Sequence, residues 1–115
     1  MLFYHVTERE HADAILREGF RGGWGDLGFG VYFYGSLDRA EDYLAEGGWD
    51  GELKDPVILV VSDDSVVEIT EWDLDPAWEP EKYEDMHWRP MDPDTEEAWK
   101  PASLALVEDT PAPAA

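Results

Sequence analysis

The pattern of apolar and polar residues at the start of the chain predicts a strand followed by a helix. Residues 2–6 are apolar and suit a short buried strand. Three apolar residues then recur at helical spacing, namely Ala12, Ile15 and Leu16. A helix is therefore expected over residues 8–18. Thr7 and Glu10 predict a capping box at its start, and Gly19 predicts its end.

A loop, a second strand and a second helix are predicted next. Residues 21–29 are rich in glycine and predict a loop, whereas the aromatic run at residues 30–34 predicts a strand. Ser36 is a typical helix N-cap. An apolar helix face follows it, formed by Leu37, Ala40 and Leu44. Gly47 and Gly48 are expected to end this helix.

The second half of the chain predicts strands. The unbroken VILVV run at residues 57–61 indicates a strand that is buried on both faces. Further strands are expected at residues 66–70, 86–90 and 103–108, with acidic, tryptophan-bearing turns at residues 71–84. Two early helices and five or six strands, most of them late, predict an α+β fold with a strongly bent sheet or two small sheets.

The length of 115 residues suits one domain with a single core. We expect that domain to span residues 1–108, and residues 109–115 to form a disordered tail. The content of 43% hydrophobic and 13% aromatic residues is typical of a packed protein. The chain has no cysteine, no basic leader before an apolar segment, and no apolar run near the roughly 20 residues of a membrane helix. A cytoplasmic protein without a membrane segment is therefore expected.

The chain is strongly acidic, with 28 acidic and 8 basic residues and a formal net charge of −20. Proteins that bind nucleic acids gain most of their affinity by neutralising phosphates with Lys and Arg, so this charge argues against nucleic acid as a partner. The excess of acid fits high solubility. It also fits attraction to a basic partner, or mimicry of nucleic acid.

Histidines and tryptophans carry weaker signals. His11 is expected on the exposed face of the first helix, while His5 and His87 fall in separate strands, so no metal site is predicted. Four tryptophans are spaced along the acidic second half of the chain: Trp72, Trp78, Trp88 and Trp99. Tryptophan packs loops onto cores and also anchors partners, and here we favour packing.

Two stretches carry an ordered set of motifs. The first opens with F-Y-H-x-T and leads into a helix that ends I-L-x-x-G-F, and the second reads G-x-G-V-Y-F before a helix with A-x-x-Y. In this order and spacing, residues 2–45 resemble the NAD-dependent ADP-ribosyltransferases. The resemblance is strongest to the diphtheria-toxin and poly(ADP-ribose) polymerase branch, whose signature is His, Tyr and an acid on three strands. Small rifamycin-modifying transferases are similar in size and opening.

The resemblance implies an ADP-ribosyltransferase-like bent or split sheet and a binding site for NAD. His5 matches the family histidine, which hydrogen-bonds the ribose next to nicotinamide. Val6 and Thr7 match positions that hold the carboxamide and the ribose. Tyr32, with Gly30 in the same motif, matches the signature tyrosine beside the nicotinamide.

A second tyrosine is implied as well. Tyr43 matches the polymerase tyrosine that stacks on the nicotinamide ring. Ala40 lies three residues before it, where those enzymes often carry a serine. One hydrogen bond to the carboxamide is therefore missing or supplied by another group.

The third catalytic residue is an acid whose position the resemblance leaves open. In the polymerase pattern the acid begins the strand that pairs with the last one, and this implies Glu84 as the first choice or Asp85. The rifamycin-modifying relatives favour Asp73 or Asp75. If none of these acids reaches the ribose, the domain binds NAD poorly or serves as a catalytically dead scaffold.

The chemistry explains why such residues are needed. Cleavage of the bond between nicotinamide and ribose builds positive charge on the sugar, so the site has to hold a flat ring and place a carboxylate nearby. Tyrosine rings suit the flat ligand, and a neutral imidazole can bind a ribose hydroxyl without repelling the developing cation. Glycines in the loop allow the backbone to approach a ligand.

The resemblance therefore implies a transferase that uses NAD as substrate. It would move ADP-ribose to a cationic protein surface or to an uncharged small molecule and release nicotinamide. Four arginines could offset the acidic field around this anionic substrate: Arg9, Arg17, Arg21 and Arg39. One alternative is a non-enzymatic acidic inhibitor that binds a basic partner protein. Another is an RNA 2′-phosphotransferase, but the basic surface of that class is missing here.

Overall fold

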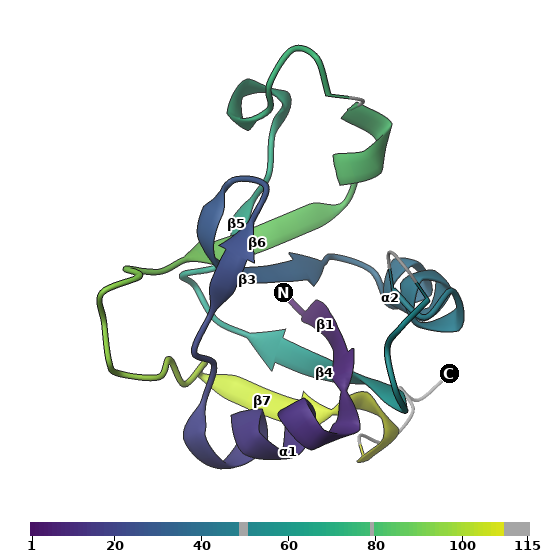
Figure 1. The fold of residues 1–115 in the computed structure, drawn as a ribbon, viewed down its shortest axis with the longest axis vertical. Helices are drawn as coiled ribbons and strands as arrows, with labels where there is room; N and C mark the ends of the chain where they lie inside the picture. The colour runs from purple at the N-terminus through teal and green to yellow at the C-terminus, as the bar shows by residue number, and fades with distance from the viewer. Residues whose placement is uncertain (49–50, 79, 110–115) are drawn as a thin grey trace.

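The computed structural model describes residues 1–48, 51–78 and 80–109 and has the predicted α+β architecture (Figure 1). Its two α-helices are α1 (Arg9–Glu18) and α2 (Leu37–Ala45). The strands are β1 (Phe3–Glu8), β2 (Gly23–Gly25), β3 (Gly28–Tyr34), β4 (Pro56–Ser62), β5 (Val67–Glu68), β6 (Met86–Pro90) and β7 (Ser103–Leu106). They form one sheet in the order β5-β6-β3-β1-β4-β7, with β2 paired to β3 outside this path.

The centre of the sheet consists of two antiparallel ladders that meet at one backbone pair. β1 pairs with β4 along its whole length, and β3 pairs with β6 from Gly30 to Tyr34. Between β1 and β3 the register contains a single pair, Tyr4 with Tyr34. β1 and β3 therefore lie next to each other in the sheet order but separate beyond this pair.

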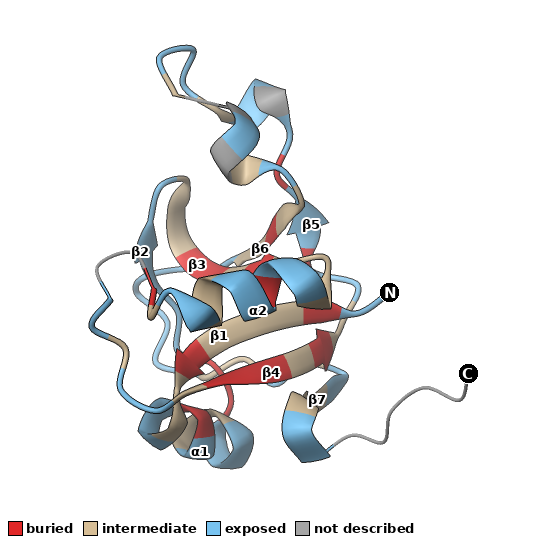
Figure 2. Cartoon of the chain, turned by 90° about the vertical axis from the view of Figure 1, so that its right-hand side faces the viewer, coloured by how far each residue is buried: buried red, intermediate tan, exposed pale blue. Residues whose placement is uncertain are grey.

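The two helices pack on different sides of β1 and β4 (Figure 2). The main core cluster joins Ala12 of α1 to Phe33, Leu59 and Val61 of the sheet. Ala40 of α2 is fully buried outside that cluster. β4 is thus covered on both faces, as its apolar sequence predicts.

The predicted capping box of α1 is wrong, although the helix begins within one residue of the predicted start. Its N-cap is Glu8, and no side chain caps the helix there. Thr7 is still part of β1, where it pairs with Val57 and is almost fully buried, so its hydroxyl cannot close a capping box with Glu10. The predicted end is confirmed, because the N–H of Gly19 donates to the Ile15 carbonyl at 2.7 Å.

The predicted start of α2 is confirmed. Ser36 is the N-cap, and its hydroxyl accepts a hydrogen bond from the backbone N–H of Arg39 at 3.4 Å. The helix ends at Ala45, just before the predicted glycines. Gly47 and Gly48 follow with φ of 72° and 86°, a conformation that glycine adopts more easily than other residues.

Three predicted element boundaries are wrong. Residues 21–29 are a hairpin rather than a plain loop, since β2 pairs with β3 there. The strand expected at residues 66–70 shrinks to β5 because the carboxylate of Asp73 accepts hydrogen bonds from the backbone N–H and hydroxyl of Thr70, which turns the chain. The last strand ends at Leu106, and a 3₁₀ helix follows (Val107–Asp109). The predicted disordered tail lies outside the described residues from position 110 on.

Three of the four tryptophans pack as predicted. Trp88 stacks on Tyr32 with ring centroids 5.5 Å apart, and Trp99 stacks on Phe20 at 5.4 Å. Trp78 stacks on Tyr83. The prediction is wrong for Trp72, which is 89% exposed. It lies in a short 3₁₀ helix of the segment that projects beyond β5 and β6 (Figure 1).

Candidate functional site

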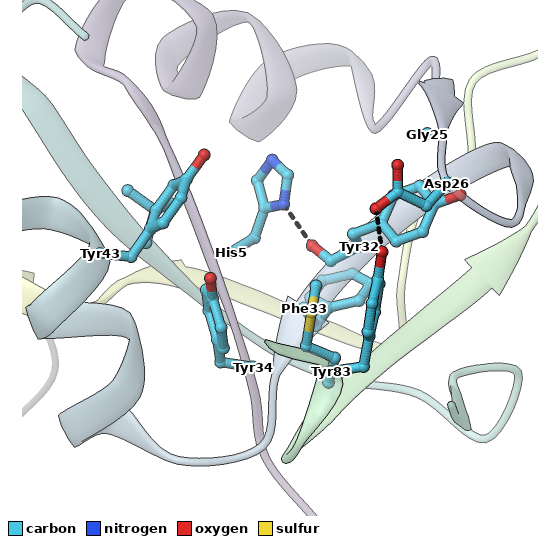
Figure 3. A pocket seen from close by; sticks show the side chains of 10 residues that line it. His5, Gly25, Asp26, Tyr32, Phe33, Tyr34, Tyr43 and Tyr83 are labelled. Atoms are coloured by element: carbon cyan, nitrogen blue, oxygen red, sulfur yellow. Dashed lines mark hydrogen bonds between the residues drawn. The ribbon is translucent and has the colours of Figure 1, made fainter. Parts of the chain in front are cut away.

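A pocket of about 230 Å³ opens where β1 and β3 separate. Its wall includes three residues that the sequence singles out: His5 of β1, Tyr32 of β3 and Tyr43 of α2. Val6, also predicted, lies beside His5. The remaining lining residues are Gly25, Asp26, Phe33, Tyr34, Tyr83 and Met86. Figure 3 shows His5 in the middle of this wall, with Tyr43 on one side and Tyr32 on the other.

His5 bridges the two separating strands. Its Nδ1 lies 2.8 Å from the carbonyl oxygen of Tyr32. Because a carbonyl only accepts, Nδ1 carries the hydrogen, and Nε2 of the neutral ring is an acceptor. Burial lowers the pKa of His5 below its ordinary value, and the hydrogen bond to the Tyr32 carbonyl opposes this only in part. The pocket therefore contains an uncharged imidazole at neutral pH.

The burial of His5 makes stability depend on pH. Since its folded-state pKa lies below the ordinary 6.5, the unfolded chain takes up a proton at this residue before the native chain does. The contribution of His5 is complete above pH 6.5 and is lost as the pH falls below that value, at up to about 1.4 kcal/mol per pH unit. We expect the wild type to lose stability relative to His5→Gln over this range in urea unfolding. His11→Gln is the control, and a constant difference for His5→Gln would contradict the prediction.

Tyr32 is fixed by the β2–β3 hairpin. Its hydroxyl donates to the Gly28 carbonyl at 2.7 Å and accepts from the Leu27 N–H at 3.2 Å. A Cβ at Gly25 would lie 2.6 Å from Cζ of Tyr32, so only glycine leaves room for the ring at that position. The ring is therefore held between the hairpin and Trp88, at the edge of the pocket.

Tyr34 and Tyr43 form the opposite side of the pocket. Their ring centroids are 5.7 Å apart. Burial raises the pKa of Tyr34 to about 12, so the phenol stays neutral at neutral pH. Tyr34 was not among the predicted site residues, although its spacing of two from Tyr32 predicts that both point to the same face of the strand.

Asp26 and Tyr83 were also missed. The Tyr83 hydroxyl donates to Oδ2 of Asp26 at 2.7 Å, as the dashed line in Figure 3 marks. This hydrogen bond is the main reason why the pKa of Tyr83 rises to about 12. Asp26 is in the hairpin turn, and Tyr83 ends a 3₁₀ helix (Pro80–Tyr83) far along the chain. No local sequence pattern signals that the two meet.

Thr7 and Gly30 do not line this pocket. They line a neighbouring one of about 500 Å³, which shares His5 and Tyr32 with the first. Arg21 lines the neighbouring pocket too, and its guanidinium donates to the Glu96 backbone carbonyl at 3.3 Å. The two pockets are thus adjacent, and the predicted residues divide between them.

Glu84 lines neither of these two pockets. Its carboxylate is exposed and lies 3.6 Å from the guanidinium of Arg39. With Asp85 it lines a separate acidic depression. The position inferred for the acid is also wrong, because β6 pairs with β3 and β5, whereas the last strand, β7, pairs with β4.

The other candidate acids take part in local turns. Asp73 accepts the hydrogen bonds of Thr70, and Asp75 accepts one from the Ala77 N–H at 2.8 Å. Neither residue lines the pocket of His5.

Among the arginines, Arg9 is engaged elsewhere. It forms ion pairs with Asp55 at 3.0 Å and with Glu108 at 2.7 Å. Arg17 donates to the Asp13 backbone carbonyl. Of the four predicted arginines, Arg21 is the one that lines a pocket together with His5.

No three His, Asp or Glu side chains in residues 1–48, 51–78 and 80–109 are grouped closely enough to hold a metal ion. In the same ranges, no helix combines the length and hydropathy of a membrane span. Comparisons of the chain with protein-family models, curated proteins and solved structures give no match.

Proposed function

We propose that the chain is an NAD-dependent ADP-ribosyltransferase. The observation that carries this proposal is the convergence of His5, Tyr32 and Tyr43 on one pocket, from two strands and a helix. These are the residues that the motif resemblance assigns to nicotinamide and its ribose. The separation of β1 and β3 beside that pocket also agrees with the bent or split sheet that the resemblance implies.

The dimensions and chemistry of the two pockets support this ligand. Pockets for drug-sized ligands occupy about 300–1,000 Å³, so the smaller pocket suits a single aromatic ring and not a whole dinucleotide. Tyrosine rings line it on both sides, and such rings favour stacking with a flat ligand. The neighbouring pocket of about 500 Å³ would hold the rest of NAD, with Arg21 near the pyrophosphate.

The reaction breaks the bond between C1′ of the ribose and the nicotinamide nitrogen. The bonding electrons leave with nicotinamide, which becomes neutral. A nucleophilic atom of the acceptor, or water, bonds to C1′ and releases its proton. A neutral His5 can bind a ribose hydroxyl without adding positive charge beside the developing cation. The net charge of −20 favours a cationic protein surface or an uncharged small molecule as acceptor.

Nicotinamide release from NAD tests the proposal. We expect the wild type to release nicotinamide, measured by chromatography, and His5→Ala to reduce the rate by about 100-fold because the ribose is no longer oriented. Tyr43→Ala should weaken NAD binding. Trp72→Ala, at an exposed position outside the pocket, is the matched aromatic control and should keep the wild-type rate.

Two outcomes would contradict the proposal. The first is a folded wild type that releases no nicotinamide. The second is a His5→Ala variant with the full rate. If the chain is instead an acidic inhibitor of a basic protein, His5→Ala and Tyr43→Ala retain partner binding, and neutralisation of surface acids removes it. Mass spectrometry of lysate proteins after incubation with labelled NAD would identify the acceptor.

A further inference from the structure

We infer that Asp26, oriented by Tyr83, is the carboxylate that stabilises the positive charge on the ribose when nicotinamide leaves. This inference rests on the proposed function. Asp26, in the turn of the β2–β3 hairpin, then takes the role of catalytic acid that the resemblance gave to Glu84. The catalytic set would then be His5 and Asp26, with Tyr83 as a positioning residue.

The reaction needs one negative group close to the sugar. Charge that develops in a transition state is best stabilised by a group that is already in place, because no reorganisation is then required during the reaction. An exposed carboxylate that lies farther than about 8 Å from the sugar contributes little, because its charge is screened at physiological salt. The relevant acid is therefore the one that lines the pocket.

Asp26 meets this condition, and the acids expected from the sequence do not. In the part of the chain that the structure describes, Asp26 is the one carboxylate that lines the smaller pocket, in which His5 lies between Tyr32 and Tyr43. Glu84 faces Arg39 in the acidic depression, and Asp73 holds a turn. The surface carries many acidic residues, but among the described residues only Asp26 contributes a carboxylate to the smaller pocket.

Two tyrosines hold the turn around Asp26. Tyr83 donates to Oδ2 at 2.7 Å, and its own ring stacks on Trp78 with centroids 5.8 Å apart. The Tyr32 hydroxyl binds the N–H of Leu27, the next residue in the chain. With Oδ2 occupied, Oδ1 has no hydrogen-bond partner among the described residues. One oxygen fixes the carboxylate and the other is available to a ligand.

The arrangement also gives the bound substrate a direction. Figure 3 shows Tyr34 and Tyr43 on one side of His5, and Asp26 with Tyr83 on the other. A nicotinamide ring against Tyr43 would direct its ribose across His5 toward Asp26. The bond that breaks would then lie between the ring-binding side and the carboxylate.

The test compares Asp26→Asn with Glu84→Gln. Both variants remove one negative charge from an exposed residue, so both are expected to fold. Asp26→Asn should reduce kcat for nicotinamide release by about 100-fold, and Glu84→Gln should leave it unchanged. Calorimetry should show that Asp26→Asn binds NAD at least as tightly as the wild type, because a repulsive charge is gone. Tyr83→Phe should lower kcat by about tenfold with little change in KM.

A second measurement does not depend on activity. With ¹³Cζ-labelled tyrosine, the Tyr83 resonance should titrate with a pKa of about 12 in the wild type, and this pKa should fall in Asp26→Asn. The inference is overturned if the Tyr83 pKa is the same in both proteins. It is also overturned if Asp26→Asn keeps its kcat, or if Glu84→Gln loses it, in a wild type that releases nicotinamide. A wild type without any release removes the proposed function, and the inference with it.

Discussion

Phe33→Ala is expected to lower the free energy of unfolding by about 3–5 kcal/mol. Phe33 is 1% exposed and lies among four other aromatic rings, namely Phe3, His5, Phe20 and Trp99. Phe33 belongs to the core and also lines the pocket, and its removal leaves a cavity that the surrounding structure fills only in part. For a chain of this length the melting temperature should fall by roughly 10–20 °C. Thermal and urea unfolding followed by circular dichroism measure both quantities.

Trp72→Ala is the matched control for this prediction. It removes an even larger aromatic side chain, but from a position that is 89% exposed, so its effect should stay within about 0.5 kcal/mol. Equal losses in the two variants would contradict the burial of Phe33.

Gly25→Ala is expected to cost about 1–3 kcal/mol and to displace Tyr32. The new Cβ would lie 2.6 Å from Cζ and 2.8 Å from the hydroxyl oxygen of Tyr32, so the ring has to leave Trp88 or the hairpin has to open. Both movements break the hydrogen bond from Tyr32 to Gly28. Urea unfolding measures the cost, and a shift of the ¹³Cζ resonance of Tyr32 reports the displacement.

The same strand supplies the control. Gly23→Ala places an equal Cβ where no heavy atom lies within 4 Å, so stability should remain within about 0.5 kcal/mol of the wild type. If Gly25→Ala is as stable as Gly23→Ala, the close packing of the Tyr32 ring against Gly25 is contradicted. In the proposed enzyme, Gly25→Ala should also slow nicotinamide release, because Tyr32 and Asp26 both depend on this hairpin.

Local patterns predicted the elements that depend on local interactions. Helical spacing located α1 and α2, Ser36 located the start of α2, and the VILVV run located β4. Thr7 was misjudged because its place in the β1–β4 ladder overrides its capping preference. The length of β5 was overestimated because the carboxylate of Asp73 accepts the hydrogen bond of the Thr70 backbone N–H.

The candidate site was predicted in part for the same reason. His5, Tyr32 and Tyr43 belong to motifs within one continuous stretch of sequence, and they line one pocket. Asp26 and Tyr83 are 57 positions apart, and their contact depends on how the projecting segment folds back to the hairpin. With 28 acids in the chain, residue type alone could not distinguish Asp26 from Glu84.

The single backbone pair between β1 and β3 has a mechanical consequence. A sheet usually deforms as one plate because many backbone hydrogen bonds run across every pair of strands. Here Tyr4 and Tyr34 make the one rung between the two ladders, and the ring of His5 adds a side-chain link to the Tyr32 carbonyl. Widening of the gap therefore leaves both ladders intact, and it strains that rung, that link and the packing of Phe33 against Phe3 and His5. A small molecule bound in the gap would connect the two ladders and make the whole domain more rigid.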